Sequence, residues 1–157
     1  MRNKGRLAGM TALVCLAFFL SAGLASASGR GVTDDSVELG FVLVKTGPVA
    51  ALGIPQGNAM IDYMKYINEK GGINGRKIKV LWEDDGFHAP KAVAAVKKLM
   101  TRDKVLTVMT TGGTNQTIAN MKNIKRYKIV NIPNAMSLEF FDPLNPYIFA
   151  LGALYEW

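Results

Sequence analysis

Three acidic residues and the sole histidine stand close together and are the side chains best able to do chemistry. Glu83, Asp84 and Asp85 are consecutive, and His88 follows three positions later. Such a set could bind a metal ion or act as general acid and base. Consecutive residues at the end of a strand point in alternating directions, so these carboxylates are not expected to converge on one ion. Since no G-x-S-x-G motif supplies a nucleophile for His88, the sequence favours a protein that is not an enzyme.

A glycine-bearing segment from Lys45 to Gly53 could bring backbone N–H groups close to an anion. A dinucleotide site would need G-x-G-x-x-G, and a nucleoside triphosphate site would need G-x-x-x-x-G-K-[ST]. Neither pattern fits, because Gly47 and Gly53 are separated by five residues and no lysine follows Gly53. Pro48 also removes an N–H that a phosphate would use. We therefore expect no cofactor and no bound metal.

Two further segments offer polar groups to a small ligand. Gly112 and Gly113 precede a predicted helix, and Thr114 is well placed as its N-cap. A ligand carboxylate could compete for the same N–H groups and the same hydroxyl, so capping and ligand binding both remain open. The segment from Pro133 to Ser137 offers an amide and a hydroxyl, although asparagine and serine are also ordinary turn residues.

The elements that must position these segments alternate along the chain. Short β-branched runs are followed by longer segments of helical periodicity, and Gly71-Gly72 should end the first helix. This order predicts an α/β fold, a parallel sheet with helices on both faces. In such sheets ligands bind at the carboxyl ends of the strands. The predicted strands cover residues 37–44, 77–82, 105–110 and 129–132, and the predicted helices cover 57–70, a segment from 90 to about 100, and 114–126.

The N-terminus has the pattern of a cleavable signal peptide. Arg2, Lys4 and Arg6 precede an uncharged apolar run over residues 7–20, which is shorter than the roughly 20 residues of a membrane-spanning helix. Ala25-Ser26-Ala27 matches the A-x-A cleavage pattern. We expect residues 1–27 to be removed and residues 28–157 to be periplasmic without a membrane anchor. The sole cysteine, Cys15, lies inside the apolar run, so a lipid anchor is not expected.

The charge of the remaining 130 residues is modest. Three of the 19 basic residues and none of the 12 acidic ones lie in the first 27, which leaves a net charge of +4. Nucleic-acid binding needs a basic stripe, often with aromatic residues for stacking, and the sequence shows neither. The densest basic cluster, from Lys122 to Lys128, is explained as the solvated end of a helix, where cations favour the dipole. We expect no nucleic-acid partner.

Several spaced motifs together resemble the Leu/Ile/Val-binding family of type I periplasmic binding proteins. They are Thr46-Gly47-Pro48-Val49-Ala50 with Gly53, the stretch from Asn68 to Ile78, and Glu83-Asp84-Asp85 with Pro90-Lys91. The resemblance implies two α/β lobes that close on a small polar solute, such as a branched-chain amino acid or amide. It also implies delivery of that solute to an ABC permease in the inner membrane. Residues 28–157 would then form the N-terminal lobe.

The resemblance also implies which residues hold the ligand. The loops after the third and fourth strands would bind its carboxylate and ammonium. The segment from Lys45 to Gly53, which follows the first predicted strand, would add further contacts, and Leu52 stands where some members have an aromatic residue. His88 and a glycine near Gly112 replace a cysteine pair of some members, and Met136 or Ser137 replaces a threonine. The expected ligand-binding residues are Thr46, Leu52, Gly113, Thr114, Asn134, Ala135, Met136 and Ser137.

Family members are much longer than this chain, which ends at Tyr155-Glu156-Trp157. We therefore expect an incomplete lobe that binds its solute weakly, because half of the cleft is missing. A non-functional truncated remnant is an alternative interpretation. A ligand-sensing domain of a signalling system is another, and a cleavable signal without an anchor favours transport over it.

Overall fold

The computed structural model describes residues 29–149 and 151–155, so the predicted signal peptide lies outside the described residues. Strands and helices alternate along this part of the chain, as the sequence predicted. The elements are β1 (Ser36–Val42), α2 (Ala50–Glu69), β2 (Lys77–Glu83), α3 (Ala89–Thr101), β3 (Thr107–Thr111), α4 (Thr114–Tyr127), β4 (Asn131–Ile132) and a 3-10 turn, η1 (Leu138–Phe140).

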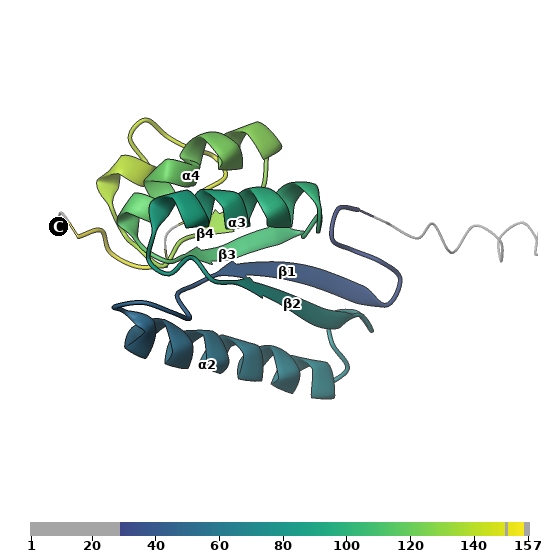
Figure 1. The fold of residues 1–157 in the computed structure, drawn as a ribbon. Coiled ribbons are helices and arrows are strands. Elements are labelled where there is room, and N and C mark those ends of the chain that lie inside the picture. The colour runs from purple at the N-terminus through teal and green to yellow at the C-terminus, as the bar shows by residue number, and fades with distance from the viewer. Residues whose placement is uncertain (1–28, 150, 156–157) are drawn as a thin grey trace, which may run out of the picture.

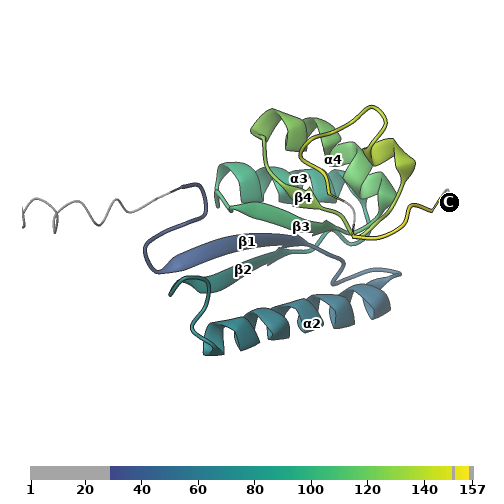
Figure 2. The same cartoon turned by 180° about the vertical axis from the view of Figure 1, so that it is seen from behind.

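The four strands form one sheet in the order β2-β1-β3-β4, and every neighbouring pair is parallel. Helices α3 and α4 lie on one face of this sheet and α2 lies on the other (Figures 1 and 2). The predicted α/β fold with a parallel sheet and helices on both faces is therefore confirmed. All four strands end at the same edge of the sheet, because they run in the same direction.

Helix α2 begins seven residues before its predicted start and includes Pro55. Helical periodicity did not reveal this part of the helix, because it contains two glycines. Both glycines lie where a side chain would collide with neighbours. A Cβ on Gly53 would lie 2.2 Å from the Val44 carbonyl oxygen, and a Cβ on Gly57 would lie 2.3 Å from the Trp82 ring. Close packing against β1 and β2 therefore explains the glycines. The predicted helix end is confirmed, because Gly71 and Gly72 both have positive φ.

The strand ends differ from the predicted ones because burial and strand pairing are separate properties. Leu43 and Val44 are fully buried but lie beyond the end of β1. Strand β4 contains only two residues. Lys128 ends α4 in a left-handed conformation, and Ile129 is buried although the pairing with β3 begins only at Asn131. The free edge of β4 meets a later segment, where Asn131 pairs with Ile148.

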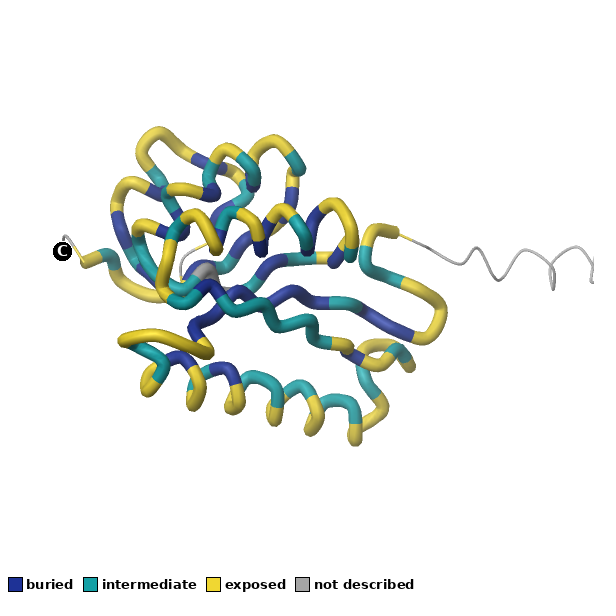
Figure 3. Tube along the Cα trace, viewed as in Figure 1, coloured by how far each residue is buried: buried dark blue, intermediate teal, exposed yellow. Residues whose placement is uncertain are grey.

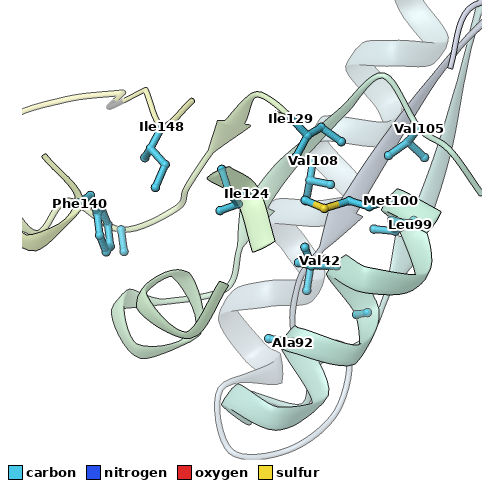
Figure 4. Close-up of a cluster of buried hydrophobic side chains, with 13 residues drawn as sticks. Val42, Ala92, Leu99, Met100, Val105, Val108, Ile124, Ile129, Phe140 and Ile148 are labelled. Atoms are coloured by element: carbon cyan, nitrogen blue, oxygen red, sulfur yellow. The ribbon is translucent and has the colours of Figure 1, made fainter. Parts of the chain in front are cut away.

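The two faces of the sheet are buried to different degrees (Figure 3). Leu99 and Met100 of α3 lie beside Val105 and Val108 in a cluster that fills the space between the sheet and α3 and α4 (Figure 4). On the opposite face, a smaller buried cluster is flanked mainly by half-buried side chains of α2 and β2. The smaller cluster contains Val37, Leu39, Phe41 and Ile78.

A helix that crosses a bilayer must be both long and apolar. Within residues 29–149 and 151–155, no helix combines the length and the hydropathy that crossing a membrane requires.

Candidate functional site

A cavity of about 170 Å³ lies at the carboxyl edge of the sheet. It is bordered by the end of β1, the first turns of α2, and the loops that follow β2, β3 and β4. This is where a parallel sheet is expected to bind a ligand. Its volume is below the roughly 300–1,000 Å³ of typical small-molecule sites, as expected of one side of a cleft. The lining residues are Leu43, Val44, Val49, Leu52, Gly53, Gln56, Phe87, Gly112 and Asn134.

The side chains that line this cavity are mostly apolar. Leu52, at the start of α2, is 75% exposed, so it presents an aliphatic surface to solvent beside the cavity. Gln56 and Asn134 are the polar side chains of this lining, and no charged side chain lines it within the described residues. The cavity can therefore hold an uncharged, largely apolar part of a solute.

The loop between β1 and α2 (residues 43–49), called here the first loop, is held to the loop after β2 by Asp84. Its carboxylate accepts hydrogen bonds from the Lys45 N–H (2.7 Å), the Thr46 N–H (3.2 Å) and the Thr46 hydroxyl (2.6 Å). Desolvation acts to raise the pKa of Asp84, but these hydrogen bonds and one from the Gly86 N–H outweigh it and lower the pKa from 3.8 to about 2. The predicted site residue Thr46 thus holds Asp84 and does not line the cavity.

The neighbouring carboxylate, Asp85, is fully buried. It accepts a hydrogen bond from the Phe87 N–H at 2.9 Å, and its other oxygen lies against Gly112. A Cβ on Gly112 would lie only 2.9 Å from that oxygen, so this close approach requires a glycine. Burial raises the pKa of Asp85, the Phe87 N–H opposes the rise, and the charge of Asp84 adds to it.

Phe87 connects the loop after β2 with the loop after β3. Its backbone has φ of 61°, an uncommon conformation for a bulky residue, and its ring lies 3.0 Å from where a Cβ on Gly113 would be. The ring also lines the cavity. The resemblance places His88 and a glycine near Gly112 where some members have a cysteine pair, whereas the residue of this loop that contacts Gly113 is Phe87.

The three consecutive acidic residues have different partners. Glu83 pairs with Lys98 of α3, Asp84 holds the first loop and Asp85 is directed at Gly112. The prediction that the three carboxylates do not converge is confirmed. Among the described residues, no three His, Cys, Asp or Glu side chains are close enough together to hold a metal ion.

The start of α4 differs from its prediction in one respect. Gly113 is the N-cap and Thr114 is the first helical residue, so the prediction that Thr114 caps the helix is wrong. The physical reason is that Gly113 adopts an extended backbone, with φ of 166°, and the helix begins one residue earlier than a threonine cap at position 114 would need. The first N–H groups of α4 have no helical partner, as at every helix start.

The loop after β4 places its residues differently with respect to the cavity. Asn134 is exposed and lines the cavity, whereas Ala135 and Ser137 are buried and do not line it. The Met136 carbonyl accepts a hydrogen bond from the Tyr155 N–H at 2.7 Å, which ties this loop to the last described residues.

Asn134 and Gln56 form reciprocal hydrogen bonds between their amides, of 2.7 and 2.8 Å. Of the predicted site residues, Leu52 and Asn134 thus line the cavity directly, and Gly113 and Thr114 follow the lining residue Gly112 along the chain. Gln56 and Phe87 were not predicted from the sequence. Gln56 was hidden by the undetected start of α2, and no sequence signal reveals the positive φ that turns Phe87 toward Gly113.

Residues 36–157 match the family model described as "Periplasmic binding protein". The chain belongs to the periplasmic binding protein family. This confirms the resemblance seen in the sequence and assigns the chain to a family of solute-binding proteins.

Two curated relatives are similar to part of this chain. A leucine-specific-binding protein of Salmonella typhimurium is 34% identical over 77 residues, which are 49% of this chain and 21% of that protein. Leu/Ile/Val-binding protein homolog 4 of Brucella abortus is 28% identical over 123 residues, 74% of this chain and 29% of that protein. The chain therefore spans less than a third of the length of these curated relatives.

Solved structures in this family share the fold. A fatty acid ABC transporter substrate-binding protein from Thermomonospora curvata has a TM-score of 0.74 and 30% identity, with 83% of this chain and 33% of that chain covered. A branched-chain amino acid ABC transporter protein from Thermus thermophilus with bound valine has a TM-score of 0.71 and 26% identity, with 79% and 32% covered. Since one is named for fatty acids and the other holds valine, the shared fold leaves the ligand open.

Proposed function

We propose that this chain captures a small solute, such as a branched-chain amino acid or an amide, outside the inner membrane and passes it to an ABC permease. No covalent chemistry is involved. The observation that carries the proposal is the cavity at the carboxyl edge of the sheet, whose side-chain lining is apolar apart from two amides. An aliphatic group fits against Leu52 and Phe87, while the solute carboxylate lies toward the start of α4.

The start of α4 supports this placement. The first N–H groups of a helix, together with its dipole, favour a negative group. Thr114 does not act as the N-cap, so its hydroxyl is proposed to bind the solute carboxylate. Gly113 contributes backbone groups, and Ala135, Met136 and Ser137 are proposed to contribute from the loop after β4. Thr46 would act indirectly, through its hydrogen bond to Asp84.

Export is part of the proposal. We propose that residues 1–27 are a signal peptide and that residues 28–157 are released into the periplasm as the N-terminal lobe of a solute-binding unit. Mass spectrometry of periplasmic material should then find a chain that begins at Ser28. A retained Met1 would contradict it.

Titration of the isotope-labelled chain followed by NMR tests the binding function. Leucine, isoleucine, valine and a small amide are added separately, with aspartate and lysine as charged comparisons. We expect weak binding, with affinity on the order of millimolar, because a single lobe buries only part of the solute. Shifted signals should cluster at residues 112–114 and 134–137. Absence of any shift with every solute would contradict the proposed function.

A further inference from the structure

A pair of amide side chains bridges two distant parts of the chain at the cavity. Gln56, in the second turn of α2, donates to the Asn134 Oδ1 at 2.7 Å, and Asn134 donates back to the Gln56 Oε1 at 2.8 Å. The two residues are 78 positions apart, and both line the cavity. The bridge joins the side of the cavity formed by α2 to the side formed by the loop after β4.

Fold stability does not explain this bridge well. Asn134 is exposed and Gln56 is half-buried at the surface, so water could satisfy both amides equally well, and pairing orders two flexible side chains. Its location accounts for it better. The other side chains of the described lining are apolar, so Gln56 and Asn134 supply the side-chain hydrogen bonding that this cavity offers to a solute.

The two reciprocal hydrogen bonds also determine which donors and acceptors of the pair remain for a solute. Each amide has two N–H donors and a carbonyl oxygen with two lone pairs. The bridge uses one donor and one lone pair from each amide, and leaves one of each. The remaining groups are neutral. A charged side chain placed here would lose hydration without gaining an opposite charge.

We propose that Gln56 is a positioning residue, which orients Asn134 and gives the cavity an uncharged amide border that selects solutes with uncharged side chains. This inference rests on the proposed solute-binding function and names the class of solute. Gln56 acts through Asn134, and together they disfavour acidic and basic side chains because no opposite charge lines the described cavity.

The test compares four variants of the chain by NMR titration with leucine, aspartate and lysine. Gln56→Ala and Asn134→Ala each remove the bridge, and the double variant removes both amides. Asn58→Ala is the matched control, since Asn58 is an exposed amide on the same helix that does not line the cavity. Thermal unfolding of each variant shows whether the fold has changed.

We expect Gln56→Ala to weaken leucine binding roughly five- to tenfold with an unchanged melting temperature. The double variant should bind no more weakly than Asn134→Ala alone, because Gln56 acts through Asn134. Asn58→Ala should bind as the unaltered chain does. In Gln56→Ala the side-chain amide signals of Asn134 should also move before any solute is added, which a purely structural effect elsewhere would not produce.

A charge variant supplies the second measurement. Gln56→Glu keeps an acceptor for Asn134 but adds a negative charge, so it should raise the ratio of lysine to leucine affinity by about tenfold. Unchanged leucine affinity in Gln56→Ala, or an unchanged ratio in Gln56→Glu, would overturn the proposal while leaving the solute-binding function intact. If the unaltered chain binds none of the solutes, the proposed function fails first and this inference fails with it.

Discussion

The two faces of the sheet differ in how completely they are covered. Between the sheet and helices α3 and α4, side chains such as Leu99 and Val108 are wholly excluded from solvent. On the other face α2 stands alone, and Met60, Met64 and Ile67 stay partly exposed around the small cluster there. The cavity lies at the carboxyl edge of the sheet, where the two faces meet. The side of the cavity that α2 forms therefore belongs to the less buried face. The side that β3 and α4 form belongs to the more buried face.

This contrast shows that the candidate site joins two parts of unequal stability. Local stability depends on buried apolar contacts, so α2 should open at a lower free energy than α3. The bridge from Gln56 to Asn134 and the contact of Asp84 with the first loop link the less buried side to the rest.

Core truncation on each face should give the largest effect and the most direct test of the contrast. Leu99→Ala should lower the free energy of unfolding by about 2–5 kcal/mol, because it leaves a cavity in a fully buried cluster. Met64→Ala on the α2 face should cost less than about half as much, since Met64 is only partly buried. Urea denaturation measures both. Equal costs would show that the faces are equally well packed.

Thr114, the first residue of α4, tests the side of the candidate site that belongs to the more buried face. Losing a hydrogen bond to a charged group typically costs about 1.5–3 kcal/mol, so Thr114→Ala should weaken solute binding roughly ten- to hundredfold. The melting temperature should stay unchanged, because Gly113 and not Thr114 is the N-cap. NMR titration measures the affinity, with the exposed neighbour variant Asn115→Ala as control. A lower melting temperature with unchanged affinity would favour a structural role.

The α2 face is probed at a close contact between that helix and β2. Gly57→Ala places a methyl group about where the Trp82 ring lies, since a Cβ would be 2.3 Å from it. Overpacking of this kind typically costs about 1–3 kcal/mol. The adjacent exposed variant Asn58→Ala should change stability by less than about 0.5 kcal/mol. If thermal denaturation shows no difference between the two variants, α2 is packed more loosely against β2 than the structure has it.

The smallest expected effect concerns the link between the first loop and Asp84. The folded-state pKa of about 2 lies below the ordinary 3.8, so ionised Asp84 stabilises the fold above about pH 4, and this contribution is lost as pH falls from about 4 to 2. Asp84→Asn should remove it.

Solvent screening limits the contribution of Asp84 to less than about 1 kcal/mol. The measurement is the difference in unfolding free energy between the unaltered chain and the variant, followed from pH 7 to pH 2. The difference should shrink below pH 4. Asp34→Asn, an exposed acid before β1, serves as the control. A difference that stays constant with pH would contradict this assignment.

Local sequence patterns predicted most of the fold. The helix end at Gly71-Gly72 and the near-complete match of β2 follow from residue-level preferences, which need no distant partner. The start of α2 could not be predicted in this way, because Gly53, Pro55 and Gly57 disfavour a helix locally and packing against Val44 and Trp82 overrides that preference.

The candidate site was only partly predictable for a related reason. The sequence pointed to the loops at the carboxyl edge, and Leu52 and Asn134 do line the cavity there. It gave no sign of Phe87, whose ring direction depends on a backbone conformation that Asp85 supports by accepting its N–H.

The sequence by itself determined the alternation of strands and helices, the parallel sheet and the family, since these depend on periodicity and on motifs read along the chain. Only the tertiary structure decided that the acidic residues separate toward Lys98, Thr46 and Gly112, and that Gln56 meets Asn134. The physical reason is that contacts between residues far apart in sequence depend on how the crossovers stack the helices on the sheet. That stacking is set by packing over the whole domain and not by any local pattern.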